Sequence, residues 1–154
     1  VIRIGISMFR CLALAKRPIG QPHNYTLQPC FGTHLCSRPG RDGAGANDRT
    51  THGTVHWSNN GSHAQYGGSK TLPSGKFADS FHVFSITWDA NSIHWLLDNV
   101  EFHSVDTSPA EMAEFREKFF IIMNVAVGGN WPGAPDATTT FPQKMYVDYV
   151  RVFQ

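Results

Sequence analysis

The amino-acid sequence predicts an all-β sandwich, and three observations support this fold class. From residue 50 to the end of the chain, short segments rich in β-branched and aromatic residues alternate with segments rich in Gly, Pro, Asn and Asp. Polar and apolar side chains alternate within several of these segments, as in strands with one buried face. A single stretch carries the signals of a helix. The sequence therefore predicts about six antiparallel strands and one short helix.

The size and charge of the chain limit the classes of function. With 154 residues, 41% of them hydrophobic, the chain is long enough for one domain with a packed core. It contains no apolar run of the roughly 18 residues that a membrane helix needs, so no membrane partner is expected. The formal net charge is +1, yet residues 1–41 contain six Lys or Arg and no acid. This segment is either a basic arm or a segment of different origin from the rest.

Residues 1–48 are expected to be mostly irregular or to be a basic segment unrelated to the domain predicted over residues 49–154. They show no sustained period of 2 or 3.6, and their second half is rich in Gly, Pro, Arg and Asn. No nucleic-acid partner is predicted, because few aromatic residues accompany the basic ones. All three cysteines lie in this segment and match no metal-binding spacing. The first residues make a poor signal peptide, since arginines interrupt the apolar ones.

The first predicted strand is THGTVHW, residues 51–57. Its polar residues alternate with its smaller and apolar ones, which places Trp57 in the core and His56 on the wet face. His52 and His56 lie four strand residues apart, roughly 13 Å, which is too far for one metal ion. The following residues, 58–75, are predicted to be a loop that starts with an Asn60-Gly61 turn.

Three further strands are predicted, over residues 81–89, 92–98 and 100–105, joined by tight turns into an antiparallel meander. Trp88 and Trp95 fall on the apolar faces of the first two and are expected to pack in the core.

Residues 108–118 carry the helix signals. Ser108 is the expected N-cap, Pro109 the first helical residue, and Glu111 the carboxylate of a capping box. The three glutamates of this helix, spaced three residues apart, are better explained by capping and solvation than by acid/base catalysis.

The stretch FFIIMNVAVGGNWP, residues 119–132, predicts a buried strand that ends in a Gly-Gly loop. Asn124 is the only strongly polar side chain in the strand. It either belongs to a buried hydrogen-bonded network or points into a cleft. The last predicted strand, KMYVDYVRVFQ, contains Asp148, which is either solvated on an outer face or binds a cation through oxygen ligands.

Four blocks of the sequence, in order, closely resemble the C-terminal half of glycoside hydrolase family sixteen, specifically the laminarinase-like endo-β-1,3-glucanases. The blocks are HGTVHWSNNGSHAQYGG, FHVFSITWDANSIHWLLDNVEFH, FFIIMNVAVGGNWPG and FPQKMYVDYVRVFQ. The resemblance covers residues 50–154. It implies an incomplete β-jelly-roll (concanavalin-like) sandwich whose concave sheet forms an open cleft for a β-glucan chain, usually in a secreted protein.

The resemblance also implies retaining hydrolysis, in which two carboxyl groups about 5 to 5.5 Å apart act as nucleophile and acid/base. In the family these groups come from an E-x-D-x-x-E motif on the strand before the T-V-H-W-like strand. This chain has no Glu before Glu101, and its only acids upstream of His56 are Asp42 and Asp48. No catalytic residue is therefore assigned, and the chain as written is expected to be inactive.

Four positions carry over from the family. His56 matches a polar position that faces the cleft, and Asn124 matches the Asn of an N-x-A-x-G-G block near the bond to be cleaved. Trp131 matches a loop Trp beside the cleft, where it either stacks on a sugar or only pins the loop. Asp148 resembles an Asp that helps hold a structural calcium on the convex face of many relatives. No other cofactor is implied.

Three hypotheses follow for the function. The chain is a truncated or mistranslated copy of an endo-β-glucanase that cleaves β-1,3 (or β-1,3/1,4) glucans, or a non-catalytic β-glucan-binding module, or a non-functional remnant. The foreign composition of residues 1–48 makes a reading-frame artefact one explanation of the missing motif.

Overall fold

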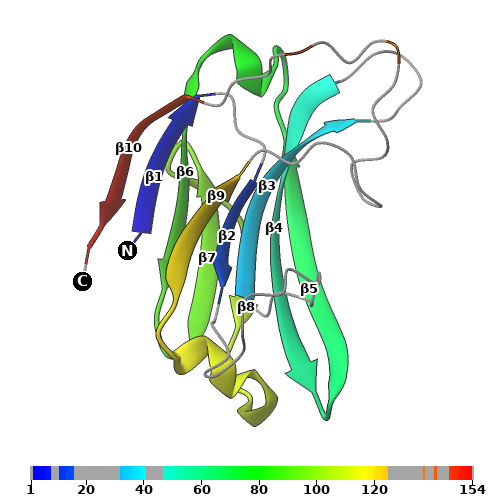
Figure 1. Cartoon of the computed structure of the whole chain (residues 1–154), viewed down its shortest axis with the longest axis vertical. Helices are drawn as coiled ribbons and strands as arrows, with labels where there is room; N and C mark the ends of the chain where they lie inside the picture. Colours follow the sequence, from blue (N-terminus) through cyan, green and yellow to red (C-terminus); the bar gives the residue numbers. More distant parts are fainter. Residues whose placement is uncertain are drawn as a thin grey trace.

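The computed structural model is a sandwich of two five-stranded antiparallel sheets (Figure 1). It describes residues 2–7, 11–15, 32–40, 47–124, 137, 141 and 146–153; before residue 49 and at residues 78, 122 and 124 only the backbone is described. The first sheet has the order β10-β1-β6-β7-β8, with strands Tyr146–Val152, Ile2–Ser7, Phe81–Trp88, Ser92–Leu97 and Val100–Asp106. The second has the order β5-β4-β3-β2-β9, with strands Ser62–Thr71, Asn47–Asn59, Gly32–Gly40, Cys11–Ala15 and Phe120–Asn124.

The two sheets are joined along one side of the sandwich. The edge strands β5 and β8 contact each other, and the ring of Tyr66 lies 5.1 Å from that of His103, centroid to centroid. Strands β5 and β8 are each at one edge of their sheet. The strands at the other edges, on the opposite side of the sandwich, are β9 and β10.

The core lies between the sheets and is built mainly by the β6–β7–β8 meander. Phe84, Ile86, Ile93 and Trp95 are each at most 1% exposed, and Val55 of β4 meets them from the second sheet. Every second residue of β7 is buried, as expected for a strand with one face on the core. The core position predicted for Trp95 is therefore confirmed.

Two short 3-10 helices cover an apolar part of the core. The first, η1 (Phe77–Asp79), buries Phe77, and the second, η2 (Ala110–Arg116), buries Met112 and Phe115. Trp57 and Trp88 are half-buried and pack against the same cluster, which agrees with their prediction as core residues. Within the described ranges, no helix has the length and apolar content needed to cross a membrane.

The predicted fold class is confirmed, as are the three strands of the meander and their turns. Asn60-Gly61 and Asp98-Asn99 both have positive φ at the two central residues, which matches the type I′ turns of two-residue hairpins. In the third turn, Asp89 Oδ1 accepts the backbone N–H groups of Asn91 and Ser92.

Other predictions were wrong. Residues 1–48 are not irregular throughout, because β1, β2, β3 and the start of β4 lie among them and pair with strands from the rest of the chain. Residues 62–71, predicted as loop, form β5. The helix is a kinked 3-10 segment with Pro109 at the N-cap, and no side chain caps it. The single turn η1 was not predicted at all.

Candidate functional site

The structure places the predicted site residues in different parts of the sandwich. His56 lies on β4 and Asn124 ends β9, so both belong to the second sheet. Asp148 lies on β10 of the first sheet. Trp131 is outside the described residues, and of Asn124 only the backbone position is known.

His56 and Asn124 are on one sheet but far apart. Their strands are separated by β3 and β2, so the lateral distance is three strand spacings, about 14 Å. Parallel to the strands, the register offsets Asn124 from His56 by four residues, which adds about 13 Å. The resulting separation of about 19 Å means that the two residues cannot act on one atom. They would contact different parts of an extended ligand.

One face of β4 points away from the core and carries the predicted polar residues. Thr51, Gly53 and Val55 are buried between the sheets, whereas the residues between them are half-buried on the other face. The predicted wet face, which includes His56, is thus confirmed. On the neighbouring strand, Gly67 comes so close to Thr54 that an added Cβ would lie 2.6 Å from the Thr54 hydroxyl oxygen.

His56 has a partner that the sequence did not reveal. Its Nδ1 lies 3.0 Å from Nε2 of His63, at a hydrogen-bonding distance. The ring centroids are 5.2 Å apart and the ring planes differ by 21°, so the two imidazoles lie nearly in one plane, edge to edge. One nitrogen must donate and the other accept, so at least one ring is neutral in this arrangement. The register Ser58↔His63 brings the two together, and only the Asn60-Gly61 turn could have predicted it.

Carboxylates are scarce in the second sheet. The strand that pairs with β4 on the side away from β5 is β3, with sequence GTHLCSRPG, and it contains no acid. Strands β2, β5 and β9 also contain none, and β4 contributes only Asp48. The position at which an E-x-D-x-x-E motif is expected is therefore occupied by a strand without Asp or Glu.

One glutamate of η2 serves the fold. Glu114 Oε1 accepts the backbone N–H of Ser58 at 2.6 Å, which ties η2 to the end of β4. The capping box predicted for Ser108 and Glu111 is wrong, because the Ser108 N–H donates to Asp106 Oδ1 instead. A hydrogen bond from the Ser108 side chain, followed by the one from its N–H, lowers the pKa of Asp106.

Asp148 does not form a cation site with other described residues. It is exposed and lies at a bulge, since Val147 pairs with Ile6 and Tyr149 with Gly5. No group of three or more His, Cys, Asp or Glu comes together in the part of the chain that the structure describes. Calcium takes six to eight oxygen ligands, so these residues do not build its site by themselves. The calcium site stays a prediction.

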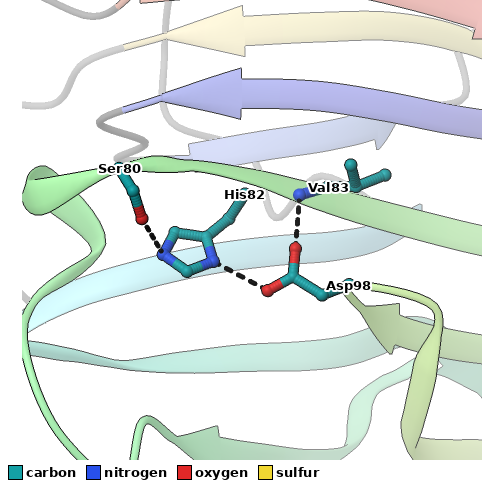
Figure 2. Close-up of polar contacts among 4 residues, drawn as sticks. All are labelled: Ser80, His82, Val83 and Asp98. Atoms are coloured by element: carbon teal, nitrogen blue, oxygen red, sulfur yellow. Dashed lines mark hydrogen bonds and ion pairs between the residues drawn. The ribbon is translucent and has the colours of Figure 1, made fainter.

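A second polar cluster lies at one end of the first sheet (Figure 2). His82 Nδ1 is 2.8 Å from Asp98 Oδ2, and His82 Nε2 is 3.1 Å from the Ser80 hydroxyl. Asp98 Oδ1 also accepts the Val83 N–H at 2.9 Å. The chain of contacts from Ser80 through His82 to Asp98 resembles that of a hydrolytic triad. However, the His82 ring packs edge-on against the Phe77 ring, with centroids 5.2 Å apart. We assign this cluster to the fold, because it joins the start of β6 to the β7–β8 turn.

Comparison with known proteins identifies a family. Residues 42–151 match the family model described as "Glycosyl hydrolases family 16". The chain is 38% identical over 117 residues to "Glucan endo-1,3-beta-glucosidase A1" of Niallia circulans, covering 66% of this chain and 17% of that protein. It is 31% identical over 99 residues to "Beta-1,3-glucan-binding protein" of Penaeus monodon, covering 52% of this chain and 26% of that protein.

A solved structure has a similar fold. The endo-β-1,3-glucanase of Pyrococcus furiosus matches with a TM-score of 0.71 and 34% sequence identity. The match covers 97% of this chain and 59% of that protein. The chain thus spans less than two thirds of the length of each of these relatives.

Proposed function

Because the chain belongs to glycosyl hydrolases family 16, we propose that it is part of a domain that acts on β-1,3 or mixed β-1,3/1,4 glucans. The ligand lies along the outer face of the sheet β5-β4-β3-β2-β9. The residues present here recognise the glucan chain and do not hydrolyse it.

One observation carries the second half of the proposal: the five strands of that sheet contain a single acid, Asp48. Retaining hydrolysis needs two carboxyl groups about 5 to 5.5 Å apart, one as nucleophile and one to protonate the leaving oxygen. A sheet with one carboxylate cannot supply both. The family's reaction therefore requires residues that these strands do not contain.

The first half of the proposal is supported by the polar face of β4. The paired imidazoles of His56 and His63 lie at an exposed contact, where their polar ring edges are suited to sugar hydroxyls. Asn124, about 19 Å away on the same sheet, would contact another sugar unit of the same chain. Trp131 would offer a flat ring to a sugar face.

Two measurements on the same protein test the proposal. The chain is incubated with laminarin at high protein concentration and the reducing ends are assayed; none are expected. It is then co-sedimented with insoluble β-1,3-glucan, where binding is expected and His56→Ala and Trp131→Ala should each weaken it about tenfold.

The matched control is His94→Ala. His94 lies on β7 in the other sheet and pairs with Glu101, so its loss should leave glucan binding unchanged. Release of reducing ends would overturn the inactive half of the proposal. Sedimentation that is equal for all three variants would overturn the binding half.

A second candidate is hydrolysis by a longer protein of which these residues are a part. It is favoured by the similarity to proteins named as endo-1,3-β-glucosidases, of which this chain spans a minor share. Translating the coding nucleic acid upstream of residue 50 in all three frames tests it, since an E-x-D-x-x-E motif in another frame would support it. We further propose that the protein is secreted, as the family resemblance implies.

A further inference from the structure

His56 and His63 bring two imidazole nitrogens together near the turn of the β4–β5 hairpin. Nδ1 of His56 lies 3.0 Å from Nε2 of His63, and the contact is exposed. Ser58 is directly opposite His63 and shares a strand face with His56, so both rings extend from the same face of the hairpin. Imidazole is the commonest metal ligand among side chains, and its neutral form binds through either ring nitrogen. Two such nitrogens side by side make a candidate site for a metal ion.

The backbone of the hairpin fixes the positions from which the two rings extend. Strands β4 and β5 pair without a break along ten residues of each. The Asn60-Gly61 turn that joins them has positive φ at both residues, as in tight type I′ turns. His56 pairs with Gln65, so His63 is its diagonal neighbour, at a spacing of about 7–8 Å that long side chains bridge. The two rings are therefore held together before an ion binds, which lowers the entropy lost on binding.

The distance between the two nitrogens fits a chelated ion. Two nitrogens bound to one ion by bonds of about 2.1 Å lie about 3.0 Å apart at a right angle and about 3.4 Å apart at the tetrahedral angle. The observed separation is 3.0 Å. At present the N–H of one ring points at the lone pair of the other, because the rings meet edge to edge with planes that differ by 21°. Binding therefore requires each ring to turn, so that both lone pairs point at an ion beside the line between the nitrogens.

The donor atoms select the class of ion. His82 and His94 each contact one carboxylate, whereas His56 and His63 offer two imidazoles at one point. Nitrogen donors favour Cu²⁺, Ni²⁺ and Zn²⁺, whereas Ca²⁺ and Mg²⁺ prefer oxygen. In the part of the chain that the structure describes, no third His, Cys, Asp or Glu joins the pair, so water would complete the coordination.

We propose that His56 and His63 chelate a divalent transition-metal ion, with Nδ1 of His56 and Nε2 of His63 as its protein ligands. The proton of the present hydrogen bond moves to the other nitrogen of its own ring, so both rings stay neutral and no proton is lost. After this shift His56 carries its proton on Nε2 and His63 carries its proton on Nδ1. The site does not depend on the binding of a glucan.

The test uses Ni²⁺ as the probe and the full 154-residue chain as the protein. The urea midpoint of the unmodified chain is expected to rise when Ni²⁺ is added, since only the folded chain holds the two rings together. Isothermal titration calorimetry gives the affinity. His63→Gln keeps a polar side chain at this exposed position but removes one ligand, so the Kd for Ni²⁺ should increase at least about tenfold and the rise of the urea midpoint should be lost.

The matched control is His52→Gln. His52 is on the same strand as His56 but four residues away, roughly 13 Å, so its substitution should leave both readouts unchanged. An equal affinity for Ni²⁺ in the unmodified chain and in His63→Gln would overturn the proposal. A urea midpoint of the unmodified chain that does not rise with Ni²⁺ would also overturn it, and this measurement needs no variant.

Discussion

At the scale of single residues, the contact between Gly53 and Trp95 shows how the two sheets approach each other. Trp95 is fully buried, and its indole lies over the backbone of β4 at Gly53. A Cβ at position 53 would lie 2.5 Å from Trp95 Cγ, well inside van der Waals contact. Any other residue would push the sheets apart or force the indole from its rotamer.

Gly53→Ala is therefore expected to destabilise the chain by about 1–3 kcal/mol, as overpacking of a core does. The measurement is urea unfolding followed by tryptophan fluorescence. The double variant Gly53→Ala/Trp95→Phe should lose less stability than the sum of the two single changes, because the smaller ring leaves room for the methyl group. Additive effects would show that the close approach does not limit this position.

His103 is the residue whose protonation is coupled to folding in the clearest way. Its ring stacks on Trp95 with centroids 4.9 Å apart, and burial lowers its pKa below the ordinary value of 6.5. Between the lowered pKa and 6.5, the unfolded chain binds more protons than the folded one. The contribution of His103 to stability is therefore complete above pH 6.5 and is lost as the pH falls through this interval.

The expected result is that His103→Phe, which keeps an aromatic ring over Trp95, gains stability relative to the unmodified chain as the pH falls from about 7 to about 5. The measurement is the urea midpoint of both proteins across that range. A difference between the midpoints that does not change with pH would contradict the prediction.

At the scale of elements, the meander of β6, β7 and β8 could be predicted because its signals are local. Two turns with Asn or Asp at their centres and alternating apolar residues specify it. The strand β5 could not be predicted in the same way. Its Gly67 and Gly68 read as loop residues, but Gly68 is required because an added Cβ would lie 2.6 Å from the His103 ring. That reason exists only once β8 is in place.

The geometry of the β7–β8 turn also leads to a testable prediction about Asp98. This residue has φ of 51°, which non-glycine residues other than Asn and Asp rarely adopt. Its carboxylate accepts the backbone N–H of Val83 and is hydrogen-bonded to the His82 ring. Asp98→Ala should cost about 1–3 kcal/mol, from the strained backbone and the lost hydrogen bonds. Asp98→Asn keeps the tolerance for positive φ and one acceptor, so it should cost clearly less. Equal losses, measured by thermal unfolding, would mean that the turn does not depend on this side chain.

At the scale of the whole molecule, the sandwich fold could be predicted from the sequence. The full set of strands that build it could not. The wet face of β4 and the shortage of carboxylates could be inferred from the residues around His56. The His56–His63 pair, the strands before residue 41 and the seam between β5 and β8 depend on pairings between distant segments. Hydrophobic periodicity and turn residues are local signals, so they do not specify pairings between distant segments.

The uneven packing of the molecule predicts uneven protection. The fully buried core residues of β6 and β7 are at most 6% exposed, namely Phe84, Ile86, Ile93, Trp95 and Leu97, whereas the valines of β10 are 37–52% exposed. Opening β10 therefore exposes little new apolar surface, and opening β6 or β7 destroys the core. In native-state hydrogen exchange with increasing denaturant, the amides of β7 should exchange only through global unfolding. Those of β10 should exchange through a smaller opening with a lower free energy and a weaker dependence on denaturant. If β10 instead exchanged with the same free energy as β7, the exposed side would be held by contacts as strong as those of the core.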